Sequence, residues 1–217
     1  PRDDGATPVV CPLPLLCDDH VRHIGEPLAM IVARSRAAVA DAMDGIEVDI
    51  DDAPAVTGIA FLRRLGDAGA VTAALADAHH QITAQIDVPR ATAASLEPRG
   101  GIAIARPDGG LNYSVSTQSP FAIRAQLCTL FGWKPEMVHV TAPDVGGSFG
   151  LKGFMTREDA LLCWAARRLG ASIAWLPSRS EAMLSDSQGR GVTGHISLGF
   201  DADMRITALD ADLHVDA

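Results

Sequence analysis

The chain has 217 residues, of which 47% are hydrophobic and 21% are charged. This balance is typical of a globular protein, and it excludes a collagen-like or largely disordered chain. The 18 basic and 27 acidic residues give a formal net charge of −9, which argues against a general nucleic-acid binder, because such a protein needs a basic surface.

The first third of the chain predicts one compact β-α-β unit followed by a crossing segment. The apolar run 28–33 predicts a buried strand, and the alternation at 46–50 predicts a half-exposed one. Ser35 can cap a helix between them, over residues 36–43, which Gly45 ends. Residues 55–78 are rich in Ala and Gly and predict the crossing between two structural regions, with a weak helical pattern around 73–79.

From residue 81 onward the pattern is mainly that of strands with three helices between them. Strands are predicted by alternation and by flanking turn residues at 81–88, 101–105, 111–117, 137–141, 172–176, 192–200 and 205–215. Helices are predicted by N-cap residues and capping-box spacings at 120–131, 156–169 and 178–185. The predicted class is α+β with mixed sheets, and the last two strands form a hairpin.

Short apolar runs and scattered cysteines limit the remaining classes. No run approaches the roughly 20 residues of a membrane span. No C-x-x-C pair is present, which argues against a zinc ribbon or an iron–sulfur cluster held by this chain; the cysteines are Cys11, Cys17, Cys128 and Cys163. We expect free thiols in a reducing, cytoplasmic compartment, with only the Cys11/Cys17 pair open to another role. The chain starts at Pro1 and stops on an alternating run, so we expect a piece of a longer protein.

The segment 143–153, P-D-V-G-G-S-F-G-L-K-G, is the most informative. Its glycines let the backbone adopt positive φ and approach a ligand closely, and successive N–H groups in such a loop form a concave donor surface. It matches neither the Walker loop nor G-x-G-x-x-G. On the glycines alone, a tight turn between a strand and a helix explains the segment equally well.

Two other segments are ambiguous when taken singly. Gln118 falls where a strand ends and a helix begins, a position that directs a side chain into a cleft, and its amide can donate and accept. The local pattern favours an ordinary surface glutamine. Glu97 and Arg99 in L-E-P-R-G are most simply explained as an exposed ion pair before a strand.

Taken together and in order, these segments resemble the molybdenum-hydroxylase large subunits of the xanthine dehydrogenase and aldehyde oxidase family. The resemblance covers most of the chain. Each motif alone is weak, but several in register are specific. The matching stretches are V-R-H-I-G-E-P-L-A at 21–29, V-D-I-D-D-A-P-A-V at 48–56, L-E-P-R at 96–99, S-T-Q-S-P at 116–120, V-G-G-S-F-G-L-K at 145–152 and S-R-S-E at 178–181.

The resemblance implies a fold and a chemistry. It implies the C-terminal part of a hammerhead-like α/β domain at 1–56, a linker at 57–79, and the N-terminal part of a mixed-sheet molybdopterin-binding domain at 80–217. In this family a molybdenum atom carried by a pterin dithiolene hydroxylates an aldehyde or heteroaromatic carbon with oxygen from water, and the protein supplies no direct metal ligand.

Individual roles follow by the same resemblance. Gln118 matches the glutamine that hydrogen-bonds a molybdenum oxygen ligand. The loop whose backbone approaches the molybdenum and pterin is matched by Gly146, Gly147, Ser148, Phe149 and Gly150. Phe149 also lines the substrate side. Arg179 matches a position in the core of the domain, without direct cofactor contact.

Departures from the family pattern limit the prediction. Gly153 stands where xanthine-oxidising members carry a substrate-binding Glu, so purine specificity is unsupported. The family's general base, a glutamate far towards the C-terminus, has no match here, so we expect the isolated chain to be inactive. A non-catalytic structural module of the same family stays an alternative, as does a small-molecule binding domain that uses the glycine loop for phosphate.

The implied partners are an iron–sulfur subunit with [2Fe-2S], a flavin subunit with FAD, and the remaining part of the same subunit. The cofactor of bacterial relatives is commonly the cytosine dinucleotide form. A truncated sheet would leave apolar surface and unpaired strand edges, so self-association is also expected.

Overall fold

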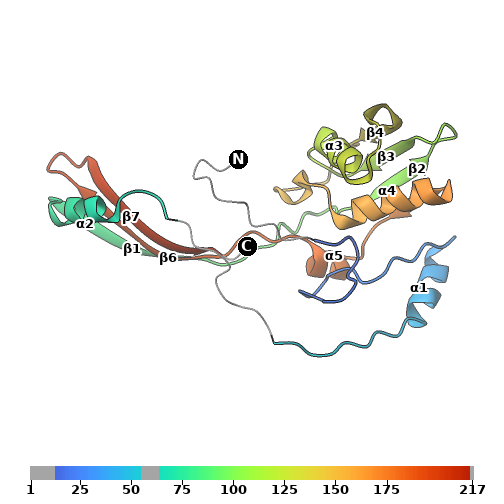
Figure 1. Ribbon diagram of the computed structural model, residues 1–217, viewed down its shortest axis with the longest axis horizontal. Helices are drawn as coiled ribbons and strands as arrows, with labels where there is room; N and C mark the ends of the chain where they lie inside the picture. The colour runs from blue at the N-terminus through green and yellow to red at the C-terminus, as the bar shows by residue number, and fades with distance from the viewer. Residues whose placement is uncertain (1–12, 55–63, 216–217) are drawn as a thin grey trace. The chain divides into compact units, whose positions relative to one another are not determined.

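A computed structural model describes residues 13–54 and 64–215. Within this part, the chain divides into two units (Figure 1). The first contains residues 13–46 and 92–187, and the second contains residues 47–54, 64–91 and 188–215. The units therefore interleave along the sequence, and the predicted domain bounds at 56 and 79 stay a prediction.

The first unit is built on a four-stranded mixed sheet in the order β4-β3-β2-β5. Its strands are β2 (Gly101–Ala105), β3 (Leu111–Val115), β4 (Val138–Thr141) and β5 (Ser172–Trp175). The β3–β4 pair is parallel and the other two pairs are antiparallel. All four strands lie where the sequence predicts them.

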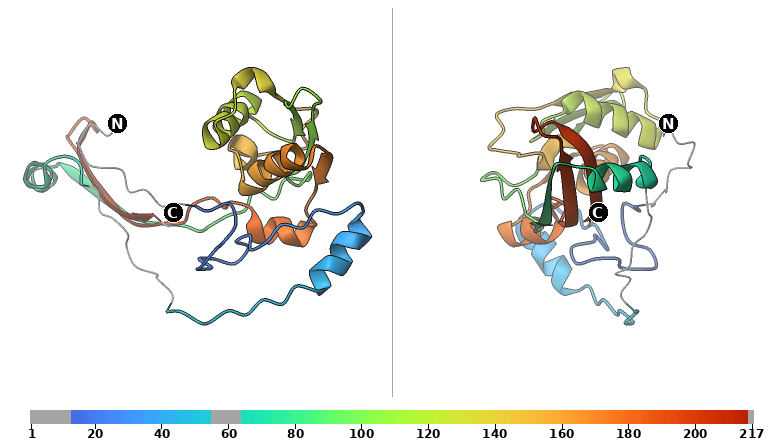
Figure 2. Two further views of the ribbon diagram at one scale, coloured as in Figure 1. Left: turned by 45° about the vertical axis from the view of Figure 1, so that its right-hand side comes forward. Right: turned by 90° about the vertical axis from the view of Figure 1, so that its left-hand side faces the viewer.

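Two helices, α3 (Pro120–Phe131) and α4 (Arg157–Leu169), cover one face of this sheet (Figures 1 and 2). Ala103 and Tyr113 are cross-strand partners on that face, and both are buried. The helices contribute Ile123, Leu127, Leu162, Cys163 and Ala166 to the same core. On the other face, Ile102 and Ile104 stay 48% and 42% exposed, so this unit has one covered face.

Caps determine where these helices begin and end. Thr156 and Asp159 form the predicted reciprocal capping box of α4, which satisfies backbone donors at the helix start. Gly132 and Gly170 end α3 and α4 in the left-handed conformation, where a β-carbon would cost energy. Ser119 precedes α3 as predicted but its side chain makes no capping hydrogen bond.

The N-terminal segment corrects the sequence prediction. Helix α1 (Arg36–Asp44) forms, with Ser35 as N-cap and Gly45 as C-cap. The predicted strands at 28–33 and 46–50 are wrong, because both stretches are irregular and Val48 is 56% exposed. A strand needs a neighbour for its N–H and C=O groups, and no described strand pairs with either stretch.

The second unit is an antiparallel sheet in the order β1-β6-β7. Its strands are β1 (His80–Val88), β6 (Val192–Phe200) and β7 (Ile206–Val215), and one helix, α2 (Ala68–Ala76), contacts β6 and β7. The predicted hairpin is confirmed, and α2 begins earlier than its weak pattern indicated. The prediction of mixed sheets therefore holds only for the first unit. Of the predicted crossing at 55–78, residues 55–63 lie outside the described residues, and the remainder contains α2.

The register of this sheet separates its two faces by polarity. One face carries apolar side chains in matched rows, for example Ile82, Leu198 and Leu209. The opposite face carries rows such as Gln85, His195 and Asp212. Leu209 and other members of the apolar face are about half exposed, and β1 and β7 are edge strands.

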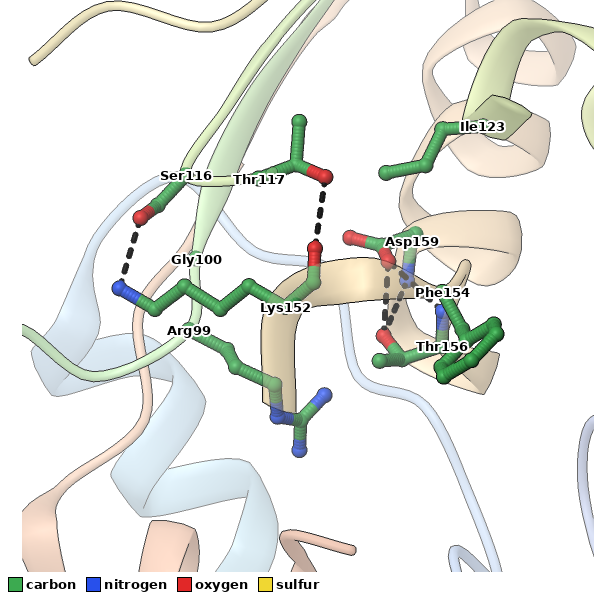
Figure 3. Close-up of a pocket in the computed structure, with 9 residues that line it drawn as sticks. All are labelled: Arg99, Gly100, Ser116, Thr117, Ile123, Lys152, Phe154, Thr156 and Asp159. Carbon is green, nitrogen blue, oxygen red and sulfur yellow. Dashed lines mark hydrogen bonds between the residues drawn. The ribbon is translucent and has the colours of Figure 1, made fainter. Parts of the chain in front are cut away.

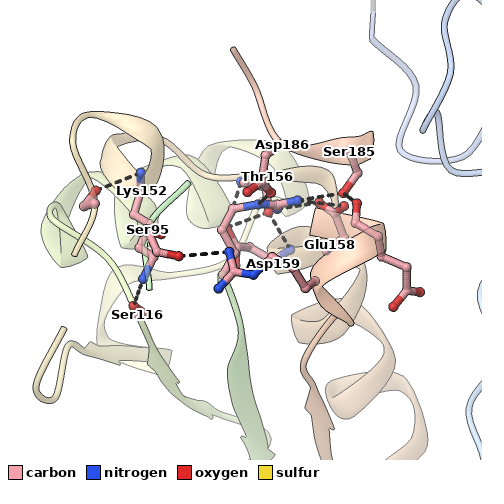
Figure 4. A network of polar contacts seen from close by, with 12 residues as sticks. Ser95, Ser116, Lys152, Thr156, Glu158, Asp159, Ser185 and Asp186 are labelled. Carbon is pink, nitrogen blue, oxygen red and sulfur yellow. Dashed lines mark hydrogen bonds and ion pairs between the residues drawn. The ribbon is translucent and has the colours of Figure 1, made fainter. Parts of the chain in front are cut away.

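Arg99 joins the sheet of the first unit to its helices. Its guanidinium donates to both carboxylate oxygens of Glu158 in α4, at 3.0 and 3.3 Å, and to Asp186 at 2.6 Å. Figure 4 shows Glu158, Ser185 and Asp186 gathered at this place. Burial lowers the pKa of Arg99, but the two carboxylates outweigh it and raise the pKa above its usual value. The predicted Glu97–Arg99 ion pair is thus wrong, because each side chain pairs with a distant partner.

The V-R-H-I-G-E-P segment lies against α4 and α5 (Arg179–Ser185). A β-carbon at Gly25 would lie 2.2 Å from the Leu184 carbonyl oxygen, so only glycine fits there. The buried Glu26 carboxylate accepts from the Arg22 N–H and pairs with Arg157 at 3.3 Å. The Arg22 N–H lowers the pKa of Glu26, burial opposes this, and Arg157 lowers it further.

No helix in the described part of the chain is long and apolar enough to cross a membrane.

We predict that Arg99→Met lowers the free energy of unfolding of the first unit by about 3–5 kcal/mol, because Asp186 and Glu158 would lose their counter-charge in a buried place. Arg106→Met is the matched control, since Arg106 pairs with the exposed Asp108 and such pairs contribute about 1 kcal/mol or less. Urea unfolding followed by tryptophan fluorescence measures both, because all three tryptophans lie in this unit. Equal losses in the free energy of unfolding for the two variants would contradict the assignment of Arg99 to a buried ion-pair network.

We also predict that the isolated chain self-associates through the apolar face of the second sheet. Leu213→Lys is expected to shift the chain towards monomer, because it puts a charge on that face. His214→Lys, one residue along on the polar face of the same edge strand, is the control. Light scattering at several concentrations measures both. A wild-type chain that stays monomeric contradicts the prediction, and equal weakening by both variants indicates association through the strand edge instead.

Candidate functional site

The glycine loop connects β4 to the short 3-10 turn η2 (Leu151–Gly153), which precedes α4. Gly147 and Gly150 have φ of +97° and +94°, which only glycine adopts readily. Phe149 between them has φ +52°, a left-handed conformation that costs a side-chain-bearing residue about 1–2 kcal/mol. The loop is therefore held in a conformation that its local sequence does not favour at every position.

Four consecutive backbone N–H groups of the loop point to an external partner. In the described part of the chain, no hydrogen bond satisfies the N–H of Gly147, Ser148, Phe149 or Gly150. The flanking amides are satisfied, since Gly146 donates to Glu97 and Leu151 donates to the Ser148 carbonyl. Phe149 and Gly150 are exposed, so these unpaired amides are available to a hydrogen-bond acceptor.

Gln118 meets the loop from the junction of β3 and α3. Its Oε1 accepts from the Ser148 hydroxyl at 2.5 Å, and its backbone N–H donates to the Lys152 carbonyl at 3.0 Å. The side chain is exposed, and no acceptor for its Nε2 lies among the described residues. The structure thus brings Gln118 and the loop together, and the carboxamide adds a fifth donor group beside the four amides.

Apolar side chains and open space flank this donor set. Phe149 is 79% exposed and Phe154 is 72% exposed. A β-carbon at Gly153 would meet only the Gln118 Oε1 within 4 Å, at 3.7 Å. The position that the resemblance assigned to substrate binding therefore faces the Gln118 carboxamide, and here it is left open.

Glu97 and Lys152 hold the loop from behind. The Lys152 Nζ donates to Glu97 Oε2 at 2.8 Å and to the Ser116 hydroxyl at 2.7 Å (Figure 3). Ser116 donates to the same Glu97 oxygen at 2.5 Å, and so does the Gly146 N–H at 2.8 Å. Burial raises the pKa of Glu97, but these donors outweigh it and lower the pKa to about 2. The carboxylate is therefore ionised at every physiological pH.

Sequence reasoning missed this cluster. It treated Glu97 as an exposed residue and gave Lys152 no role, because the partners are 55 residues apart. The signal available was that both belong to matched motifs, L-E-P-R and G-G-S-F-G-L-K.

Arg179 also acts behind the loop. Its guanidinium donates to the Ser95 carbonyl at 2.9 Å and to the Leu96 carbonyl at 2.6 Å, which holds the chain that carries Glu97. The residue is exposed, so its predicted place in the core is corrected. Among the described residues, it forms no hydrogen bond or ion pair with residues 146–150.

Little space is left behind the loop, both at Gly146 and in the small pocket beside Lys152. A β-carbon at Gly146 would lie 2.5 Å from Glu97 Cβ, so the close approach of the two segments requires glycine. Lys152, Thr117, Ile123 and Asp159 line a pocket with room for little more than a water molecule (Figure 3). This pocket is therefore too small for a ligand larger than water, and it is not lined by Gln118 or by residues 147–150.

Comparison with known proteins identifies relatives of this arrangement. The family described as "Molybdopterin cofactor-binding domain" matches residues 56–217. The nicotine 6-hydroxylase large subunit of Paenarthrobacter nicotinovorans is 31% identical, over 94% of this chain and 27% of that protein. The 6-hydroxypseudooxynicotine dehydrogenase complex subunit gamma of the same organism is 28% identical, over 92% of this chain and 27% of that protein.

Solved structures agree. Quinoline 2-oxidoreductase from Pseudomonas putida 86 superposes with a TM-score of 0.81 at 29% identity, over 92% of this chain and 28% of that chain. Carbon monoxide dehydrogenase from Oligotropha carboxidovorans superposes with a TM-score of 0.83 at 23% identity, over 92% of this chain and 29% of that chain, which shows a shared fold alone. The chain spans less than a third of the length of these proteins.

Because the family match covers most of the chain and includes β3, Gln118 and the glycine loop, the chain belongs to the molybdopterin cofactor-binding domain family of the xanthine dehydrogenase, carbon monoxide dehydrogenase and aldehyde oxidoreductase large subunits.

Proposed function

We propose that the chain is the part of a molybdenum hydroxylase large subunit that lines the molybdenum end of the cofactor. The observation that carries the proposal is the run of N–H groups at 147–150 and the Gln118 Nε2 beside them, none of which has a partner among the described residues. The resemblance assigns the same residues to the cofactor. The finer fold assignment, with a hammerhead-like region at 1–56 and the N-terminal part of the cofactor domain at 80–217, is part of this proposal.

The chemistry of these groups fits the proposed cofactor. Backbone amides and a carboxamide are neutral donors, and neutral donors suit oxygen and sulfur atoms that carry partial negative charge. The glycines leave the amides uncovered, so a flat group can approach the backbone closely. We propose that Gln118 donates from Nε2 to an oxygen ligand of the molybdenum, and that Gly146, Gly147, Ser148, Phe149 and Gly150 form the surface against the metal and pterin.

The cofactor, when bound, supplies the redox chemistry that transfers oxygen from water to carbon. The residues of this chain position the groups that contact the cofactor, and they exclude water from the substrate side. Ser148 orients the Gln118 carboxamide by donating to its Oε1, which leaves Nε2 directed to a ligand. The exposed Phe149 ring is proposed to line the substrate side, where an apolar surface excludes water and favours a planar substrate.

We propose a ring carbon of a nitrogen heterocycle other than a purine, rather than an aldehyde carbon, as the site of oxidation. Two relatives near 30% identity are named for nicotine and quinoline, both nitrogen heterocycles. Gly153 supports this choice, because it leaves open space beside Gln118 where a purine-binding member would have a carboxylate. An aldehyde substrate is the alternative. The relative rates at which the assembled enzyme oxidises heteroarenes and aldehydes would distinguish the two.

The names of two relatives support a proposal for the assembly. Relatives are named as a subunit of the 6-hydroxypseudooxynicotine dehydrogenase complex and as the large chain of carbon monoxide dehydrogenase. We propose a [2Fe-2S] subunit, an FAD subunit and the remainder of the same large subunit as partners, with the cytosine dinucleotide form of the cofactor.

We predict that Gln118→Ala weakens retention of molybdenum and pterin about 10–100-fold, the usual effect of removing a group that orients metal ligands. The side chain is exposed, so stability should change little. Gln126→Ala is the matched control, since Gln126 is an exposed amide on α3 that accepts from Met155 outside the donor set. Molybdenum by mass spectrometry and pterin by fluorescence, on chains from a host that makes the cofactor, measure both.

Equal molybdenum in the two variants would remove Gln118 from the site. A wild-type chain without molybdenum, from a host that loads other molybdenum enzymes, would favour a non-catalytic structural module of the same family. Tight binding of a nucleotide at the loop would instead favour a phosphate-binding domain.

We further predict that the chain alone does not oxidise heteroarenes or aldehydes even when it holds molybdenum, because no residue in it matches the family's general base. Dye-linked oxidation assays with quinoline, nicotine and benzaldehyde measure this. Turnover by the chain alone would show that a base lies within these 217 residues.

A further inference from the structure

The loop and Gln118 come from different elements, so something must set the spacing between them. The contacts that join them converge on Lys152. Its backbone carbonyl accepts from the Gln118 N–H and from the Thr117 hydroxyl, at 3.0 and 2.9 Å. Its backbone N–H donates to the Ser148 hydroxyl at 3.0 Å, which in turn contacts Gln118. The main chain of Lys152 thus connects both halves of the donor set.

The side chain of Lys152 then holds this main chain in place. The side chain is 1% exposed, and an ammonium so deeply buried requires a negative partner. Glu97 Oε2 is that partner, and the same oxygen also accepts the Gly146 N–H. Gly146 and Lys152, which lie on either side of the free amides at 147–150, are therefore joined at one carboxylate oxygen.

The segment that carries Glu97 is itself held. The backbone N–H of Glu97 donates to the Gly146 carbonyl at 3.1 Å. The Arg179 guanidinium donates to the carbonyls of Ser95 and Leu96. Arg99, two residues further on, is engaged by Glu158 and Asp186, so it does not compete for Glu97. The charges around Glu97 are therefore arranged with Lys152 as its one ion-pair partner in the described chain.

We infer that Lys152 is a positioning residue, whose buried ion pair with Glu97 sets the distance between the free amides of the loop and the Gln118 carboxamide. The inference rests on the proposed function for the identity of the ligand, but the geometry of the empty loop tests it independently. Lys152 itself offers no donor to the ligand, because its Nζ is buried against Glu97 and Ser116.

The test compares Lys152→Met with a variant that is destabilised elsewhere. Lys152→Met keeps the length of the side chain and removes the ammonium. Leu127→Ala, at a fully buried position in α3, makes a cavity without changing a loop contact, and Leu127→Val is the milder form if it does not fold. Glu97→Gln combined with Lys152→Met removes both charges and keeps an acceptor for the Gly146 N–H.

Two readouts are measured on every variant. The first is amide hydrogen exchange of Gly146, Gln118 and Lys152 by NMR on the chain without cofactor. The second is retention of molybdenum. We expect Lys152→Met to speed exchange and weaken retention at least tenfold, and Leu127→Ala to change neither beyond its effect on unfolding. The double variant should stay as impaired as Lys152→Met, because it also lacks the ion pair.

The outcomes separate the claims. If Lys152→Met and Leu127→Ala change exchange at these amides in proportion to their loss of stability, Lys152 is an ordinary structural lysine and the inference is overturned. If the double variant recovers both readouts, the unpaired Glu97 carboxylate caused the loss in Lys152→Met, and the ion pair does not set the spacing. A wild-type chain without molybdenum contradicts the proposed function, yet the exchange measurements still decide the role of Lys152.

Discussion

The site depends on a single carboxylate oxygen. Glu97 Oε2 accepts from the Lys152 ammonium, the Ser116 hydroxyl and the Gly146 N–H. Three donors at one oxygen keep the carboxylate ionised and orient it. Through these donors, the end of β3 and the residues on either side of the loop amides contact the same oxygen. The amides at 147–150 stay without a partner among the described residues and are available to a ligand.

The polar groups of the site are of two kinds. Some are proposed to bind the cofactor, and the others hold the loop and the segment behind it. The loop amides and Gln118 face outward, whereas Glu97, Lys152 and Arg179 face one another or the backbone behind them. Phe149 adopts a left-handed conformation, and strain of this kind persists only where the surroundings determine the backbone. We propose that the ion pair between Lys152 and Glu97 behind the loop provides that determination.

Further from the loop, buried charges attach the surrounding segments to the same helices. Arg99 connects the start of β2 to Glu158 at the first turn of α4 and to Asp186 after α5. Glu26 connects the N-terminal segment to Arg157, also in the first turn of α4. Buried ion pairs add little net stability, but breaking one is costly. Their effect here is to specify which segments meet at the helix start next to the loop.

The sequence by itself determined the elements whose signals are local. Alternation placed the strands of both sheets. N-cap residues placed α1, α3, α4 and α5, and glycine stops ended the first three, because caps and side-chain periodicity act within a few residues. The family resemblance directed attention to Gln118 and the loop.

Only the tertiary structure decided what depends on distant partners. The stretches at 28–33 and 46–50 have strand-like patterns but no described neighbour to pair with, so they stay irregular. Glu97 and Arg99 lie two residues apart yet face different partners, Lys152 and Glu158, because burial compels each charge to find the opposite charge that the fold brings near. Periodicity cannot reveal such pairs, since the energy that selects them arises only once separate segments exclude water together.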